Sequence, residues 1–295
     1  PLGRVLALHS LHPEIFAVAT ERLAWQSGQN DLLLFGTLAG ARRVVLLDTG
    51  GQSRTETRAT ILGLAPFRFA GESAASTWAI ARSHSGLKKL EQAVKRGISP
   101  VVREDSFAQE SGGNLASPRI VYLRSTPGVG TQAGGAATHI NGFVNATVEL
   151  GAEIRVISND KIAGLDHAKL TLIDPEPLGS TRAAFDLRNN LIFSAGAMRE
   201  IEHEPVDLIY QRYARFSWAG VAASLRTGVP LFLEYNGSEV WIGKHWDMSG
   251  MIPLLERFER LNLDAAARIF VVSDVERRNL LRVGIADEKV VVNPN

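Results

Sequence analysis

Short apolar runs alternate with amphipathic stretches along the chain, and the alternation is most regular after residue 118. Apolar runs of strand length cover 119–124, 152–160, 206–212, 228–238, 267–274 and 289–292. Apolar residues recur at helical spacing over 140–148, 216–227, 250–263 and 275–283. Continuous apolar strands separated by amphipathic helices are typical of a parallel sheet covered on both faces. The pattern therefore predicts an α/β fold.

The first hundred residues show a similar but less regular alternation. Strands are predicted over 4–9, 31–37 and 43–48, and helices over 13–25 and 86–97. The stretch 99–117 is polar and rich in Gly and Ser, which indicates a linker. We therefore expect a smaller α/β segment over 1–110, a linker over 111–117 and a larger domain over 118–295.

Composition narrows the function classes. The 295 residues have a formal net charge of +1, which gives no support to a nucleic-acid groove. No apolar run approaches the length of a membrane-spanning helix. Because the chain has no Cys, disulfides and thiolate metal sites are excluded, and nothing in the sequence calls for a metal or a cofactor. A cytoplasmic protein is expected.

A Gly-rich stretch, "STPGVGTQAGGAATH" (125–139), follows the strand at 119–124 and precedes a helix. Backbone N–H groups at a helix N-terminus attract phosphate, and Gly134 and Gly135 carry no Cβ that would block a close ligand. The alternative is a tight turn without a ligand. A second alternative combines the glycines of 128–134 with Asp160 as an NAD(P)-binding fingerprint of imperfect spacing.

Polar residues gather where the predicted strands end. Glu234, Asn236, Ser238 and Glu239 follow the strand in "GVPLFLEYNGSEVW". Ligands of open α/β sheets lie beyond the carboxyl ends of the strands, so we expect these side chains at a ligand site. A plain polar turn is the alternative.

Three further features lie near the same predicted edge. His139 opens the helix after the glycines, and Arg212 ends another strand. Trp241 and Trp246 suggest a lid or an acceptor surface. A structural His, a solvated Arg and core tryptophans are the corresponding alternatives.

The C-terminal stretch, "AARIFVVSDVERRNLLRVGIADEKVVVNPN" (266–295), carries a resemblance to a known family. It resembles the domain junction of GT-B glycosyltransferases of the family 4 type. "GGAATH" (134–139) looks like the GG loop of that family, and "VDLIYQRY…GVPLFLEYNGSE" looks like its strand-helix-strand centre. The resemblance covers about 118–295 as a set of motifs in the same order.

The resemblance implies the N-terminal, Rossmann-like half of a GT-B fold. It implies that the chain is cut before a second, donor-binding domain, whose Glu-containing motif is absent here. The implied activity is transfer of a sugar from a nucleotide-sugar donor to a glycan, lipid-linked or cell-envelope acceptor, and peripheral membrane association is left open. A non-catalytic binding module is a further alternative.

The resemblance also implies residue roles. Gly134 and Gly135 are expected to approach the donor diphosphate. The implied catalytic residues are His139, Asn236 and Glu239, and the implied acceptor-binding residues are Arg212, Tyr235 and Ser238. Many members of the family have His-Gly where this chain has Asn236-Gly237, so a direct transfer of a catalytic His role to this position is not expected.

Overall fold

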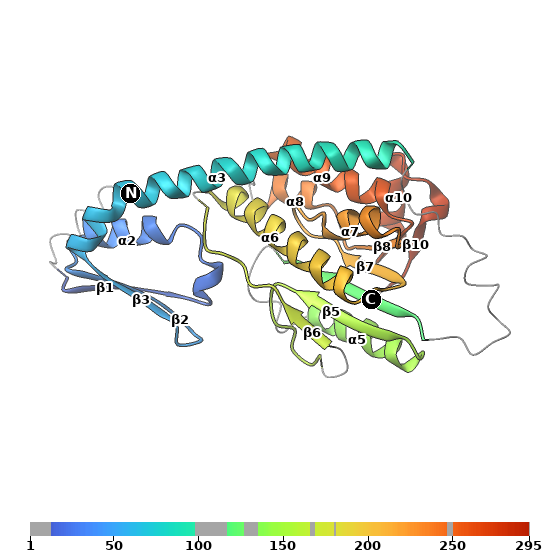
Figure 1. Cartoon of the computed structure of the whole chain (residues 1–295), viewed down its shortest axis with the longest axis horizontal. Coiled ribbons are helices and arrows are strands. Elements are labelled where there is room, and N and C mark those ends of the chain that lie inside the picture. The colour runs from blue at the N-terminus through green and yellow to red at the C-terminus, as the bar shows by residue number, and fades with distance from the viewer. Residues whose placement is uncertain are drawn as a thin grey trace. The chain divides into compact units, whose positions relative to one another are not determined.

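The computed structural model describes residues 13–97, 117–126, 135–165, 169–179, 181–246 and 250–294. The chain forms two compact units. The first is built mainly from residues up to Arg82 together with Pro175–Asn189, and the second from most of the remainder. Each unit has its own sheet, drawn in Figure 1. The predicted linker lies almost entirely outside the described residues.

The first unit is a small α/β unit in which helices pack on a three-stranded sheet with the strand order β1-β2-β3. Strand β1 pairs in parallel with β2, and β2 pairs antiparallel with β3. The core of the unit gathers Leu33, Val44, Leu46 and Ile61. Its elements are β1 (Ile15–Thr20), a 3-10 turn (Leu23–Trp25), α2 (Gln29–Leu38), β2 (Arg43–Asp48), β3 (Ser53–Thr57) and the start of α3 (Arg58–Lys95).

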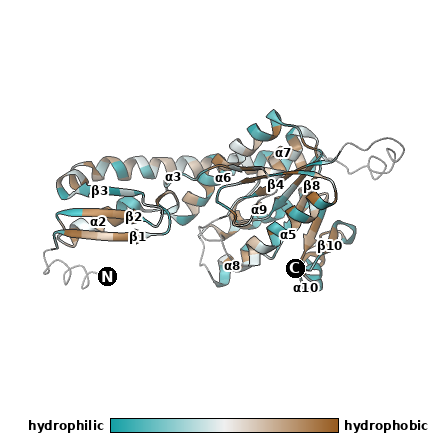
Figure 2. Cartoon of the chain, turned by 90° about the horizontal axis from the view of Figure 1, so that it is seen from below, coloured by the Kyte–Doolittle hydropathy of each residue, from teal (hydrophilic) through white to brown (hydrophobic). Residues whose placement is uncertain are grey.

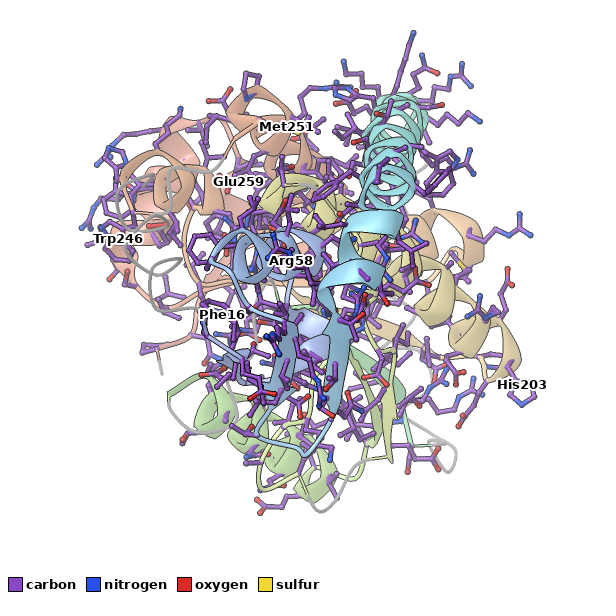
Figure 3. The ribbon with its side chains drawn as sticks, turned by 90° about the vertical axis from the view of Figure 1, so that its left-hand side faces the viewer. Phe16, Arg58, His203, Trp246, Met251 and Glu259 are labelled. Carbon is purple, nitrogen blue, oxygen red and sulfur yellow. The ribbon has the colours of Figure 1, made fainter. Side chains whose placement is uncertain are left out.

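Two predictions in this unit are wrong. The predicted helix over 13–25 is strand β1 followed by a 3-10 turn, and the predicted strand over 31–37 is helix α2. In α2 the buried positions Leu33, Gly36 and Thr37 follow helical spacing. Phe35 on another face of α2 meets Phe16 of β1 edge to face at 5.7 Å. Figure 3 labels Phe16. Short apolar runs carry too few residues to separate the two periods. The predicted strand 4–9 lies outside the described residues.

The second unit contains a seven-stranded sheet whose neighbours are all parallel, in the order β10-β9-β8-β7-β4-β5-β6. This confirms the Rossmann-like α/β class. In Figure 2 the strands are mainly brown, as expected for strands buried by helices. The strands are β4 (Arg119–Arg124), β5 (Glu153–Ser158), β6 (Lys169–Leu172), β7 (Leu208–Arg212), β8 (Leu231–Tyr235), β9 (Arg268–Val271) and β10 (Val290–Val292).

The helices after residue 118 follow the predicted alternation with some additions. Helices α5, α7, α9 and α10 correspond to predicted ones, whereas α6 and α8, like strands β3 and β6, were not predicted. Helix α3 covers most of the predicted helix 86–97, but it ends at Lys95 and begins much earlier. The helices are α5 (Gly135–Glu149), α6 (Arg182–His203), α7 (Ala219–Thr227), α8 (Glu239–His245), α9 (Ile252–Ala265), α10 (Asp274–Arg282) and a 3-10 turn (Asp287–Lys289). Within the described ranges no helix combines the length and apolar character that a bilayer crossing requires.

The strand order reverses between β4 and β7, where the chain leaves one side of the sheet and continues on the other. A crevice forms outside the carboxyl ends of strands at such a point and is where ligands bind in open α/β sheets. The register places Arg124 at the end of β4 beside Arg212 of β7, and Arg212 beside Glu234 of β8. Charged residues therefore form a row along the carboxyl edge of an otherwise apolar sheet.

Candidate functional site

The carboxylate of Glu234 is the centre of a buried cluster at the carboxyl edge of the sheet. Its Oε2 accepts a hydrogen bond from the Tyr122 hydroxyl at 2.6 Å. Its Oε1 accepts from Asn236 Nδ2 at 2.7 Å, pairs with the Arg212 guanidinium, and lies 3.3 Å from His139 Nε2. The Glu234 side chain is 3% exposed. Four side chains from β4, α5, β7 and the end of β8 are thus held by one carboxylate.

The surroundings keep Glu234 ionised. Burial by itself raises the pKa of a carboxyl group, because it disfavours the charged form. Here the hydrogen bond from His139, the charge of Arg212 and the hydrogen bonds from Tyr122 and Asn236 outweigh burial, and the pKa of Glu234 lies below its ordinary value. Burial, followed by the Glu234 charge, raises the pKa of the Tyr122 phenol well above its usual range. Tyr122 therefore acts as a hydrogen-bond donor to a fixed anion.

Aromatic packing fixes the helix that delivers His139. Phe143 stacks on Tyr210 of β7 with ring centroids 4.2 Å apart and lies 5.6 Å from Tyr122 of β4. His139 precedes Phe143 by one helical turn, so both side chains lie on the same face of α5. Packing of Phe143 against the sheet therefore carries His139 to the end of β8.

A small pocket of about 170 Å³ opens beside the cluster at the β4–β7 crossover. Arg124, Arg212, Asn236 and Glu239 are among its lining residues, and Ala136 brings the first turn of α5 to it. Arg124 is 2% exposed. Its NH1 donates to Ser158 Oγ at 3.3 Å, whereas its NH2 is buried and has no hydrogen-bond partner among the described residues. A buried guanidinium with an open donor, next to a second Arg and a helix N-terminus, suits an anionic group.

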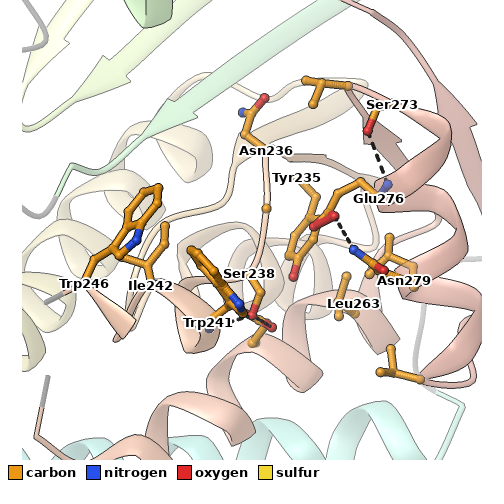
Figure 4. A pocket seen from close by; sticks show the side chains of 15 residues that line it. Tyr235, Asn236, Ser238, Trp241, Ile242, Trp246, Leu263, Ser273, Glu276 and Asn279 are labelled. Atoms are coloured by element: carbon orange, nitrogen blue, oxygen red, sulfur yellow. Dashed lines mark hydrogen bonds between the residues drawn. The ribbon is translucent and has the colours of Figure 1, made fainter. Parts of the chain in front are cut away.

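A larger cleft of about 780 Å³ adjoins the small pocket and shares Asn236, Gly237 and Ile242 with it. Gly237 has φ of 135°, a conformation that favours glycine, and it lets the chain turn from β8 into α8. Figure 4 shows this cleft. It is lined by Tyr235, Asn236, Gly237, Ser238, Trp241, Ile242, Trp246, Glu259, Leu263, Val272, Ser273, Glu276, Asn279, Leu280 and Val283.

The two predicted acceptor-binding residues of β8 and its turn make internal contacts in this cleft. The Ser238 hydroxyl caps α8 by accepting from Trp241 N at 3.1 Å, and it donates to Glu259 Oε1 at 2.8 Å. Tyr235 is 2% exposed and stacks on Tyr213 with centroids 5.7 Å apart. Burial raises the pKa of the Glu259 carboxyl. These contacts give Ser238 and Tyr235 a structural role. Their acceptor-binding role stays a prediction.

The structure brings some of the remaining predicted site residues together and leaves others apart. His139, Asn236 and Arg212 come together on Glu234, and Glu239 lines the small pocket beside them. Gly135 is the first residue of α5, and apart from its own helix backbone no described residue would lie within 4 Å of a Cβ at this position. Gly134 lies outside the described residues. The roles assigned to these residues stay predictions.

Sequence reasoning missed three features of the site. It expected Glu234 only as one polar residue at a strand end, and it assigned nothing to Tyr122 or Arg124. A signal for two of them exists in "RIVYLR" (119–124), because a Tyr and a terminal Arg interrupt a strand that is otherwise apolar at its centre. The pairing of Tyr122 with Glu234 has no local signal, because it depends on the neighbourhood of β4, β7 and β8.

Asp160 does not suit the ribose-binding role of the NAD(P) alternative. Its side chain is 0% exposed, and its Oδ1 accepts from the backbone N–H of Lys161 at 2.8 Å. A ribose hydroxyl could reach this carboxylate only if the loop after β5 opened. The glycines of 128–134 lie outside the described residues.

Comparison with protein families gives one match, and it covers most of the second unit. A family model described as a glycosyl transferase 4-like domain matches residues 134–295. No curated protein matches the chain. The matched range begins at the predicted GG loop and contains α5, β7 and β8, which carry His139, Arg212 and Glu234.

Several solved structures resemble part of the chain. A glycosyltransferase from Rickettsia africae ESF-5 is 15% identical, with a TM-score of 0.41 over 61% of this chain and 43% of that chain. Sucrose-phosphate synthase from Thermosynechococcus elongatus is 16% identical, with a TM-score of 0.47 over 60% and 48%. Anabaena HepE, in complex with UDP and glucose, is 16% identical, with a TM-score of 0.41 over 60% and 44%. The matched part of this chain corresponds to less than half of each of these proteins.

Proposed function

The chain belongs to the glycosyl transferase 4-like family, and from this premise we propose that the intact protein transfers a sugar from a nucleotide-sugar donor to a glycan or cell-envelope acceptor. In this proposal, residues 118–295 form the domain on the acceptor side of the active site. The observation that carries the proposal is the Glu234 cluster at the carboxyl edge of the sheet, directly beside an Arg-lined pocket. An ordered polar cluster at the strand-order reversal is where a ligand is expected.

The small pocket takes the anionic part of the donor. Cleavage of a nucleotide sugar leaves negative charge on the departing diphosphate, and fixed donors that face this charge lower the barrier. Arg124 offers a buried N–H that no described residue binds, and the first turn of α5 adds its backbone dipole. Because Arg124 is held inside the sheet edge, it needs no rearrangement when the charge develops.

Glu234 serves as a positioning residue. Its two oxygens already accept from Tyr122, Asn236 and Arg212, and His139 lies 3.3 Å away, so the carboxylate has little capacity left to attack a sugar. It holds instead His139 and Asn236, two of the three side chains that the resemblance assigns to chemistry. His139 and Asn236 then present their remaining polar atoms to the acceptor side of the cleft, where they hydrogen-bond sugar hydroxyls.

The test is release of free nucleotide from a panel of UDP-, GDP- and ADP-sugars by the intact protein, with and without glycan acceptors. Release from one donor that rises with one acceptor is the expected result, and it names the nucleotide. If no donor is consumed although nucleotide diphosphates bind, the protein is a binding module and the proposal is wrong. Binding of NAD(P)H in place of nucleotide sugars would also contradict it.

A further inference from the structure

The larger cleft has the size and position of a binding site for part of the acceptor. Its volume of about 780 Å³ lies within the range of about 300–1,000 Å³ that is typical of ligand pockets. Leu263 of α9, Leu280 of α10 and Val283, directly after α10, form an apolar part of its wall. Asn236 connects it with the Glu234 cluster. A molecule in this cleft therefore reaches the proposed reaction centre.

Trp241 and Trp246 form an aromatic corner at one wall of the cleft. Their ring centroids are 5.0 Å apart and their planes meet at 76°. His245 stacks on Trp241 with centroids 4.7 Å apart, and its Nδ1 lies 2.8 Å from the Trp241 carbonyl oxygen, which supports the corner from α8. Trp241 is still 47% exposed and Trp246 is 74% exposed. Exposed apolar surface that gathers in one place is typical of a site where a ligand or partner binds.

Polar side chains of α10 lie across the cleft from the aromatic corner, as Figure 4 shows. Glu276 accepts from Asn279 Nδ2 at 2.8 Å through Oε2, so its second oxygen remains able to accept from a ligand. Asn236 donates to Glu234 through Nδ2, so its Oδ1 can also accept. A flat apolar surface that faces hydrogen-bond acceptors matches a pyranose, which has C–H groups on its faces and hydroxyls at its edge.

Charge distinguishes this cleft from the small pocket. Glu259 and Glu276 are its titratable carboxyls, and no Lys, Arg or His belongs to its described lining. The small pocket, in contrast, has the two guanidinium groups of Arg124 and Arg212 against a single carboxyl group, that of Glu239. A phosphate or carboxylate would therefore be attracted to the small pocket and repelled by Glu276 in the cleft.

We propose that the larger cleft binds an uncharged sugar ring of the acceptor, stacked on the aromatic corner with its hydroxyls directed to Glu276 and Asn236. The assignment of this sugar as the acceptor rests on the proposed function. The two cavities thereby divide the substrates by charge, with donor phosphates held by arginines and a neutral acceptor ring held by tryptophans. An acceptor with an acidic sugar or a phosphate at this position is discriminated against.

The experiment measures sugar binding to the protein without any donor, by saturation-transfer NMR and intrinsic fluorescence. Glucose, cellobiose, maltose and N,N′-diacetylchitobiose are the neutral probes, and glucuronic acid and glucose 6-phosphate are the anionic ones. At least one neutral sugar is expected to bind about tenfold more tightly than glucuronic acid. Saturation should reach its ring C–H protons most strongly, because they face the indoles.

Variants locate the binding. Trp241→Ala is expected to weaken the neutral sugar about tenfold, and Trp241→Phe should retain most of the affinity because it keeps an aromatic face. Trp78→Ala is the matched control, since Trp78 is 55% exposed on α3 and belongs to neither cavity. Glu276→Gln should improve glucuronic acid binding several-fold while leaving the neutral sugar within about twofold.

Three results would overturn the inference. They are equal affinities for neutral and anionic sugars, equal effects of Trp241→Ala and Trp78→Ala, and no saturation transfer to any neutral sugar. Because the assay contains no donor, it separates the two proposals. Sugar binding without nucleotide release leaves the carbohydrate cleft standing and removes the transferase, whereas release without sugar binding here does the reverse.

Discussion

His139 on α5 places its Nε2 3.3 Å from Oε1 of Glu234 at the end of β8. If His139 contacts the reacting sugar, as the proposed function requires, His139→Ala should lower nucleotide release by about 100-fold, the order of a lost acid–base or orienting group. His203→Ala is the control, because His203 is exposed at the end of α6. Figure 3 labels it. Equal rates for the two variants would remove His139 from the reaction.

Replacement of Glu234 tests whether the cluster is structural as well as functional. Glu234→Ala leaves Arg212 and His139 without their shared carboxylate in a buried setting. Breaking such a pair from one side costs about 3–5 kcal/mol of unfolding free energy. Tyr122→Phe removes one hydrogen bond to the charge and should cost about 1.5–3 kcal/mol. Denaturant unfolding measures both, and additive losses in the double variant would show that the two side chains are not coupled.

The same carboxylate makes stability depend on pH. Burial raises the pKa of Glu234, but His139, Arg212, Tyr122 and Asn236 bring the net value below the ordinary 4.5. The unfolded chain thus binds this proton more tightly than the folded one. The stabilisation from Glu234 is therefore complete above pH 4.5 and is lost as the pH falls through the lower pKa of the folded state. Unfolding free energy measured from pH 7 downward should fall less steeply in Glu234→Gln than in the wild type.

The open space at Gly135 allows a test of diphosphate approach. Beyond its own helix backbone, a Cβ at this position would meet none of the described residues within 4 Å, so Gly135→Val should fold normally. If the donor diphosphate approaches the backbone here, the added methyl groups should weaken donor binding at least about tenfold. Gly142→Val is the matched control, since Gly142 lies in the same helix with equally open space. Equal donor affinity in the two variants would contradict the assignment.

Arg124 offers a test of the small pocket. Arg124→Met keeps an unbranched side chain but removes the NH2, which has no partner within the part of the chain that the structure describes. Loss of a charged hydrogen bond to phosphate should weaken donor binding by about 1.5–3 kcal/mol, or roughly ten- to a hundredfold. Arg119→Met on the opposite end of β4 is the control, because Arg119 pairs with Asp207 at 3.0 Å. Unfolding curves must accompany the titration, and unchanged donor affinity in a folded Arg124→Met would be evidence against an anion site.

Much of the second unit could be predicted from the sequence, and the reason is periodicity. Apolar runs such as 119–124 and 206–212 are buried on both faces, so they stand out as strands without any knowledge of their neighbours. The same holds for β8. Polar residues that follow this strand, among them Asn236 and Glu239, could therefore be placed at the carboxyl edge. In the first unit, 13–25 and 31–37 were assigned to the wrong element because short, partly buried runs fit both periods.

The sequence by itself determined which segments are strands and which polar residues end them, because local hydrophobic spacing records burial. Only the tertiary structure decided that β4 and β7 are neighbours, which puts Arg124 beside Arg212. It also decided that β8 lies on the other side of β7, which brings Glu234 to Tyr122 and His139. Strand order depends on which backbone groups pair between distant segments, and no local pattern carries that information. The two arginines of the small pocket come together because of that strand order.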